Sequence, residues 1–104
     1  MLIAMFTKLT IQSELPTADE AKEFPCGDKT ICIANVNGAY SAMDNVCLHQ
    51  GGPLGEGTLE GDVVTCPWHM WAYNVRTGEK VGVPSLKVAT YPVQVEGGEV
   101  KVAV

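Results

Sequence analysis

The amino-acid sequence predicts an all-β fold of small antiparallel sheets. Short runs rich in valine, isoleucine, threonine and tyrosine alternate with turn signals along the chain. Asn37-Gly38 and Gly97-Gly98 each separate two such runs, and both pairs are typical of two-residue hairpin turns, which need positive φ. The chain has 104 residues, a length typical of one domain, and we expect a single domain over residues 1–104.

Local patterns indicate six strands. Their predicted bounds are Lys8–Gln12, Lys29–Val36, Ala39–Asp44, Asp62–Thr65, Val88–Glu96 and Glu99–Val104. Pro92 donates no hydrogen bond to a neighbouring strand, so it favours an edge or a bulge. Ala18–Glu23, confined between Pro16 and Pro25, is the only segment that suits a helical turn. Residues 51–61 hold five of the eleven glycines, and we expect a loop that bends tightly or closely approaches another segment.

Two of the four cysteines flank a predicted hairpin whose turn is residues 27–28. The register of this hairpin pairs Cys26 with Lys29 and Glu23 with Cys32, so the two cysteines are not opposite each other. A disulfide needs Cα atoms within about 7 Å. We therefore expect Cys26 and Cys32 to be reduced thiols that pack as small hydrophobic residues.

Net charge and hydropathy limit the kinds of partner that the protein can have. The formal net charge is −5 and the isoelectric point is near 4.8, which disfavours nucleic acid and anionic membranes as partners and favours a basic patch on another protein. The apolar run Met1–Phe6 is far shorter than the ~20 residues that cross a bilayer, and it lacks the features of a signal peptide. We expect a cytoplasmic monomer with no membrane segment.

The other two cysteines each stand close to a histidine. The motifs are Cys47-Leu-His49 and Cys66-Pro-Trp-His69, and residues 50–65 separate them. Each short motif can direct one thiolate and one imidazole to a common centre, so Cys47, His49, Cys66 and His69 are the candidate metal ligands. Zinc, copper and a 2Fe–2S cluster all accept such a set. Zinc fingers place two cysteines before two histidines, whereas the interleaved order here favours a cluster; a zinc-stabilised binding domain is the alternative.

These motifs closely resemble the Rieske signature, and similarity to that family extends over most of the chain from about Lys29. The resemblance implies a Rieske-type fold with two cluster-binding loops at one end, and a cluster-binding part over about residues 44–85. It implies one 2Fe–2S cluster, with Cys47 and Cys66 on one iron and His49 and His69 on the other.

Sequence differences indicate the branch of the family. In Rieske proteins of cytochrome complexes, one further cysteine in each loop forms a disulfide, and the matching positions here are Gly52 and Trp68. Oxygenase subunits bind a second iron through two histidines, but this chain has only two histidines in all. The resemblance is therefore to free-standing Rieske ferredoxins. These are electron carriers, not enzymes, and they pass electrons from a flavin-dependent NAD(P)H reductase to a terminal oxygenase. The alternative is a Rieske-like small subunit of a nitrite reductase or another oxidoreductase.

The resemblance also assigns roles to residues beside the ligands. Tyr73 matches a tyrosine that donates a hydrogen bond to a cysteine sulfur in high-potential relatives; the alternative is a core aromatic with its hydroxyl in solvent. Trp71 stands where those relatives have a serine donor, so we expect a potential nearer ~−150 than ~+300 mV. Met70 stands where most relatives have glycine, and a positive φ there would strain it.

The same comparison indicates where a partner docks. Electron tunnelling decays steeply with distance, so we expect contact at a tip formed by Gln50, His69, Met70 and the loop of Pro84. Acidic side chains near this tip, with Glu56 as the candidate, would then steer association.

Overall fold

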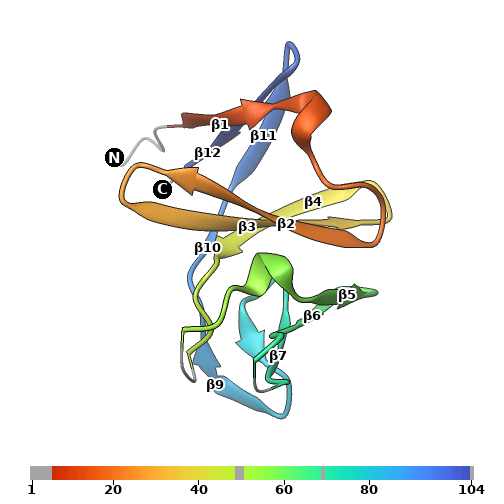
Figure 1. Cartoon of the computed structure of the whole chain (residues 1–104), viewed down its shortest axis with the longest axis vertical. Coiled ribbons are helices and arrows are strands. Elements are labelled where there is room, and N and C mark those ends of the chain that lie inside the picture. Colours follow the sequence, from red (N-terminus) through yellow and green to blue (C-terminus); the bar gives the residue numbers. More distant parts are fainter. Residues whose placement is uncertain (1–5, 49–50, 69, 104) are drawn as a thin grey trace.

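Three antiparallel sheets make up the protein (Figure 1). The structure is a computed structural model that describes residues 6–48, 51–68 and 70–103. The first sheet has the order β1 (Thr7–Ile11), β12 (Glu99–Val102) and β11 (Val93–Glu96). The second has the order β10 (Thr90–Tyr91), β4 (Ala39–Asp44), β3 (Lys29–Val36) and β2 (Glu20–Cys26). The third has the order β5 (Thr58–Glu60), β6 (Val63–Thr65), β7 (Ala72–Asn74), β8 (Glu79–Lys80) and β9 (Val83–Lys87).

Helical structure in these ranges is limited to two single 3-10 turns, η1 (Gln12–Glu14) and η2 (Leu54–Glu56). Among the described residues there is no helix long and apolar enough to cross a membrane. The strand pairs are all antiparallel, which confirms the predicted fold class.

Both faces of strand β3 are buried over most of its length. Ile31 and Ile33 pack with Val102 in a core between the first and second sheets. Cys32 points to the opposite face, as alternation along a strand requires, and packs with Val64 in a core between the second and third sheets. One strand therefore joins the two cores, and the third sheet is held against the second.

Most of the predicted strands are confirmed. β3 and β4 have the predicted bounds, β1 lies one residue earlier and β6 begins one residue later than predicted. β12 ends at Val102, and the predicted end at Val104 lies outside the described residues. The Asn37-Gly38 turn has φ values of 52° and 92°, as a two-residue hairpin with positive φ at both positions requires. The predicted register between β2 and β3 is also confirmed, because Cys26 pairs with Lys29 and Glu23 with Cys32.

The expected helical turn at Ala18–Glu23 is wrong. Residues 18–19 form a turn with φ of 66° at Asp19, and β2 then begins at Glu20. β2 pairs with β3 over its whole length, from Glu20 opposite Asn35 to Cys26 opposite Lys29. A six-residue helix is costly to nucleate, whereas each residue of β2 gains a partner on a strand already in place.

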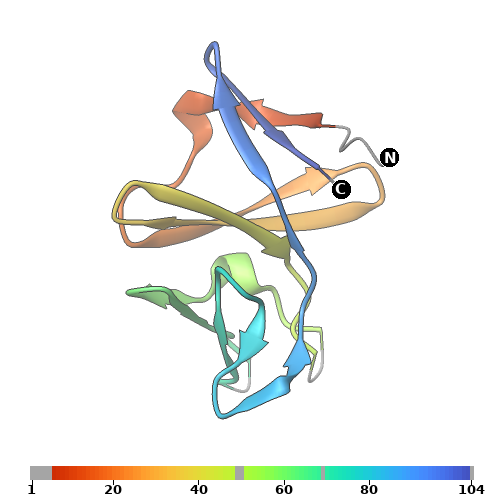
Figure 2. The ribbon, with the colours of Figure 1, turned by 180° about the vertical axis from the view of Figure 1, so that it is seen from behind.

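The single strand expected at Val88–Glu96 is also wrong in part, because it is divided at Pro92. β10 pairs with β4 of the second sheet, and β11 pairs with β12 of the first. Figure 2 shows this path along the back of the molecule, from β9 through β10 to β11. Pro92 has no N–H to donate, so the ladder ends there and the chain changes sheet, in agreement with the expected irregularity.

The glycine-rich residues 51–61 contain η2 and β5 as well as loop, and their glycines allow close approach. A Cβ on Gly55 would lie 2.6 Å from the backbone nitrogen of Glu23, so a side chain at Gly55 would collide with β2. The buried side chain of Asn45 fixes this contact. Its Nδ2 donates to Glu23 Oε2 at 2.6 Å, and its Oδ1 accepts from the Gly55 N–H at 2.6 Å.

We predict that Asn45→Ala destabilises the protein by roughly 2–3 kcal/mol, because it leaves the buried Gly55 N–H without an acceptor and removes a charge-assisted hydrogen bond. Chemical denaturation measures the free energy of unfolding. Gln94→Ala is the matched control: Gln94 also donates to a carboxylate, Glu96 Oε2 at 2.8 Å, but on the exposed surface. We expect a change within roughly 0.5 kcal/mol for the control. Equal losses in the two variants would contradict this role of Asn45.

Candidate cluster-binding site

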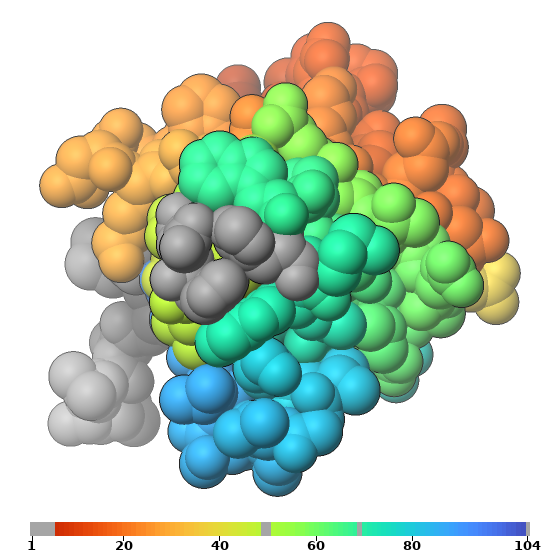
Figure 3. All heavy atoms as spheres, turned by 60° about the horizontal axis from the view of Figure 1, so that its bottom comes forward, coloured from red at the N-terminus to blue at the C-terminus, as the bar shows by residue number. Residues whose placement is uncertain are grey.

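Two loops at one end of the third sheet carry the predicted ligands. The first loop (residues 45–53) follows β4, and the second loop (residues 66–71) joins β6 to β7. Figure 3 views this end and shows the two loops and the β8–β9 segment gathered on one face. Cys47 and Cys66 are both buried, with 2% and 0% of their surface exposed. The other two predicted ligands, His49 and His69, lie outside the described residues.

The two loops share one pattern of backbone hydrogen bonds. In the first, the Cys47 N–H donates to the Gly52 carbonyl and the Gly51 N–H donates to the Cys47 carbonyl, both at 2.9 Å. In the second, the Cys66 N–H donates to the carbonyl five positions on at 2.7 Å, and the Met70 N–H donates to the Cys66 carbonyl at 3.2 Å. Each cysteine is therefore held by the same local closure, although the two sequences differ.

This closure needs positive φ four residues after each cysteine. Gly51 has φ of 75° and Met70 has φ of 60°. Glycine adopts this conformation freely, whereas a residue with a side chain is strained by roughly 1–2 kcal/mol. The structure thus confirms the suspected strain at Met70.

The two loops meet at Gly52. A Cβ at this position would lie 2.6 Å from Cys66 Sγ and 3.2 Å from Cγ of the Trp68 ring, so no side chain fits. Gly52 and Trp68, the positions that match the disulfide of the other branch, are indeed neighbours, with the indole in place of a second cysteine. The missing side chain lets the first loop lie directly on the sulfur of the second.

Tyr73 on β7 connects the first loop to the sheet. Its ring is fully buried, and its hydroxyl lies 3.3 Å from Cys47 Sγ. The Leu48 N–H donates to the same hydroxyl oxygen at 3.1 Å. Toward a deprotonated, metal-bound Cys47 sulfur, the hydroxyl would be the donor. Burial, followed by the bond to Cys47, raises the pKa of Tyr73 to about 12, so the hydroxyl stays protonated near neutral pH. The predicted contact with a cysteine sulfur is confirmed, and the alternative with a solvent-exposed hydroxyl is wrong.

Cys26 and Cys32 are free thiols, as predicted. Cys32 belongs to the same core as Cys47 and Cys66. Burial raises the pKa of the Cys32 thiol to about 12, with the Glu23 carboxylate as a second cause. A thiol that resists deprotonation is a poor metal ligand, so Cys32 is not a candidate ligand.

Sequence reasoning missed one charged neighbour of the second loop. Lys80 on β8 places its ammonium 4.6 Å from the centre of the Trp71 ring, a cation–π contact. The sequence feature that could have predicted this contact is the turn between Asn74 and Gly78. This turn brings β8 back along β7 and pairs Lys80 with Tyr73. Glu56, by contrast, lies on η2, which packs against β2 and β3. Its role in steering association stays a prediction.

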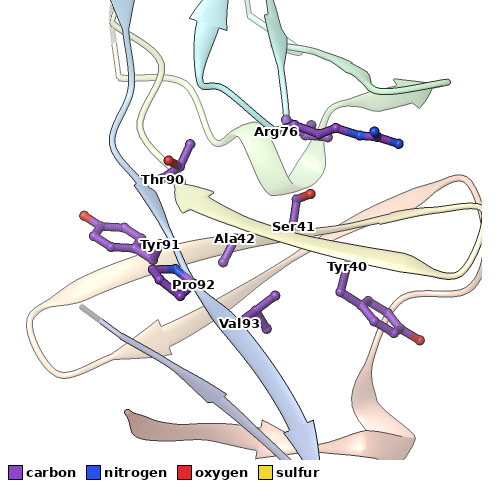
Figure 4. Close-up of a pocket in the computed structure, with 9 residues that line it drawn as sticks. Tyr40, Ser41, Ala42, Arg76, Thr90, Tyr91, Pro92 and Val93 are labelled. Carbon is purple, nitrogen blue, oxygen red and sulfur yellow. The ribbon is translucent and has the colours of Figure 1, made fainter. Parts of the chain in front are cut away.

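A pocket of about 390 Å³ lies elsewhere, between β4, β10, β11 and the residues after β7 (Figure 4). Its lining residues are Tyr40, Ser41, Ala42, Val75, Arg76, Thr90, Tyr91, Pro92 and Val93. None of them is a histidine, cysteine or carboxylate, so Ser41 meets no base there that could activate it as a nucleophile. The pocket does not supply a catalytic site.

The donor set at the loops fits an iron–sulfur cluster. Two buried cysteines come from loops of the same conformation, a tyrosine hydroxyl is directed at one sulfur, and the other sulfur lies where a side chain is missing. Small β proteins that hold two cysteines in this way, with a histidine two or three positions further along each loop, form a class of iron–sulfur proteins.

Comparison with known proteins identifies the family. Residues 6–92 match the Rieske [2Fe-2S] domain, and the chain belongs to this family, whose cofactor is one 2Fe–2S cluster. The biphenyl dioxygenase ferredoxin subunit of Pseudomonas sp. (strain KKS102) is 37% identical over 99 residues, which cover 93% of this chain and 90% of that protein.

Solved structures agree. A chain in the complex of reduced oxygenase and oxidized ferredoxin in carbazole 1,9a-dioxygenase has a TM-score of 0.81 at 30% identity and covers 97% of this chain and 94% of its own. The Sphingomonas yanoikuyae B1 ferredoxin has the same fold, with a TM-score of 0.84 at 24% identity and coverage of 96% and 99%.

We predict that Tyr73→Phe lowers the midpoint potential by roughly 40–60 mV. The hydroxyl donates to Cys47 Sγ, and a donor to sulfur stabilises the more negative reduced state by on the order of 1 kcal/mol. Voltammetry measures the shift, and Tyr40→Phe is the control with no expected change, because Tyr40 is half-buried on β4 against the other core. An unchanged potential in Tyr73→Phe would show that the hydrogen bond does not tune the cluster.

Proposed function

We propose that this protein carries single electrons to a terminal oxygenase on a 2Fe–2S cluster held by Cys47, His49, Cys66 and His69. The observation that carries the proposal is the pair of matching loops, whose two buried cysteines belong to one core, with Gly52 of the first loop lying against Cys66 Sγ of the second. The proposed cluster-binding part spans about residues 44–85 of one domain.

The comparisons support the direction of transfer. The relatives are ferredoxin components of dioxygenase systems for biphenyl, naphthalene and p-cumate, and one similar solved structure is a complex of an oxygenase with its ferredoxin. These proteins are electron carriers rather than catalysts. By extension we assign the supply of electrons to a flavin-dependent NAD(P)H reductase, and we place the protein in the cytoplasm.

The site suits reversible one-electron transfer. When bound, the cluster accepts one electron and returns it, and with two thiolates and two neutral imidazoles its charge passes from zero to −1. Around it, backbone hydrogen bonds close both loops at their cysteines, and Tyr73 of β7 contacts the first loop.

The first test is the composition of the protein. We expect two irons and two acid-labile sulfides per chain after anaerobic purification, and a paramagnetic signal after reduction by dithionite. Cys66→Ser should abolish the cluster and lower the stability of the fold, since metal binding contributes to folding. Cys26→Ser on β2 is the control and should retain both metal and sulfide. Stoichiometric zinc without sulfide would contradict the proposal.

The second test is transfer itself. The dithionite-reduced protein is mixed under anaerobic conditions with a panel of terminal oxygenases from the biphenyl, naphthalene and carbazole systems. We expect at least one of them to reoxidise it within the turnover time of an oxygenase. If none does, the assignment to oxygenase systems is wrong, whatever the cluster content.

A further inference from the structure

Met70 carries two features that do not stabilise the fold. Its backbone is in the left-handed region at φ of 60°, and 73% of the residue is exposed. The first strains the chain, and the second leaves an apolar side chain in water. Gly51 makes the equivalent turn of the first loop without a side chain. The loop conformation therefore does not need a side chain at this position.

The described residues of the two loops around Met70 expose apolar side chains, and the Lys80 ammonium lies over the Trp71 ring of the second loop. Trp68 in the same loop is 57% exposed and Leu48 in the first loop is 46% exposed. Gly52 of the first loop lies close to the Trp68 ring of the second, and Figure 3 shows described parts of both loops on one face of the molecule. Residues 45–54, 66–71 and 81–86 contain none of the chain's nineteen charged side chains (seven Lys and Arg, twelve Asp and Glu). A partner that meets this end therefore meets exposed apolar side chains of both loops, with the Lys80 ammonium beside Trp71.

We propose that Met70 is a docking anchor that inserts into an apolar recess of the terminal oxygenase. The inference rests on the proposed function, which requires the oxygenase to approach the loop of Cys66 closely. Strain at an exposed position persists when it serves binding, and a flexible thioether adapts well to an apolar recess. Affinity then comes from burial of apolar surface at the tip, and salt has little effect on the contribution of Met70.

The decisive variant is Met70→Gly, which should change stability and docking in opposite directions. Relief of the positive φ raises the melting temperature of the holoprotein by a few degrees. Loss of the side chain raises the KM for the oxygenase by roughly 5- to 30-fold, the range that a loss of ~1–2 kcal/mol of binding free energy gives. The midpoint potential and the rate of oxidation by ferricyanide, which needs no docking surface, stay unchanged. The oxygenase used is the member of the panel that reoxidises the wild-type protein fastest.

Two further variants isolate the cause. Met70→Leu keeps both the apolar side chain and the strain, so its KM should stay within about threefold of wild type and its melting temperature should not rise. Ile11→Thr removes exposed apolar surface from β1 on the first sheet, where Ile11 is 45% exposed, and should leave the KM unchanged.

A higher melting temperature together with a higher KM for Met70→Gly, in both low and high salt, supports Met70 as a docking anchor. A lower melting temperature shows that Met70 packs within the fold and overturns the proposal. An unchanged KM for the oxygenase, or a change in KM for the reductase alone, overturns it as well. If wild-type protein is reoxidised by no oxygenase, the proposed function fails first, and the two failures are thereby distinguished.

Discussion

The contact between Gly52 and Cys66 Sγ is the constraint on which the rest of the site depends. Because Gly52 has no side chain, the first loop lies on the sulfur of the second, and two cysteines far apart in sequence belong to one buried core. Tyr73 then reaches Cys47 from the sheet below, and Trp68 covers the contact from outside. The arrangement shelters both sulfurs and leaves the loop ends at the surface, which is what an electron carrier requires.

The two other sheets support this end of the molecule. β3 is buried on both faces. One face packs into the core beneath the loops, and the other packs into the core shared with the first sheet. Asn45 connects the start of the first loop to β2 and to η2 through its amide. The start of the first loop is thus placed by contacts with the second sheet, and not by the loop sequence alone.

Sequence reasoning was most successful where the signal is local. The Asn37-Gly38 turn, the bounds of β3 and β4, and the strain at Met70 all follow from the conformational preferences of neighbouring residues. It failed where the structure of a segment depends on a strand that is distant in sequence. β2 is a strand because β3 pairs with it, and the division at Pro92 reflects the choice of two different sheets. The roles of Asn45 and Lys80 depend on contacts across sheets or between strands, which no short window of sequence contains.

The central claim is that two imidazoles, from His49 and His69, complete a cluster whose other iron is held by the two buried cysteines. Pulsed electron paramagnetic resonance of the dithionite-reduced protein tests this most directly, because it detects nitrogen bound to the paramagnetic centre. The account predicts couplings from two imidazole nitrogens in the wild-type protein. A reduced cluster with no nitrogen coupling would contradict it, because all of its ligands would then be sulfur or oxygen.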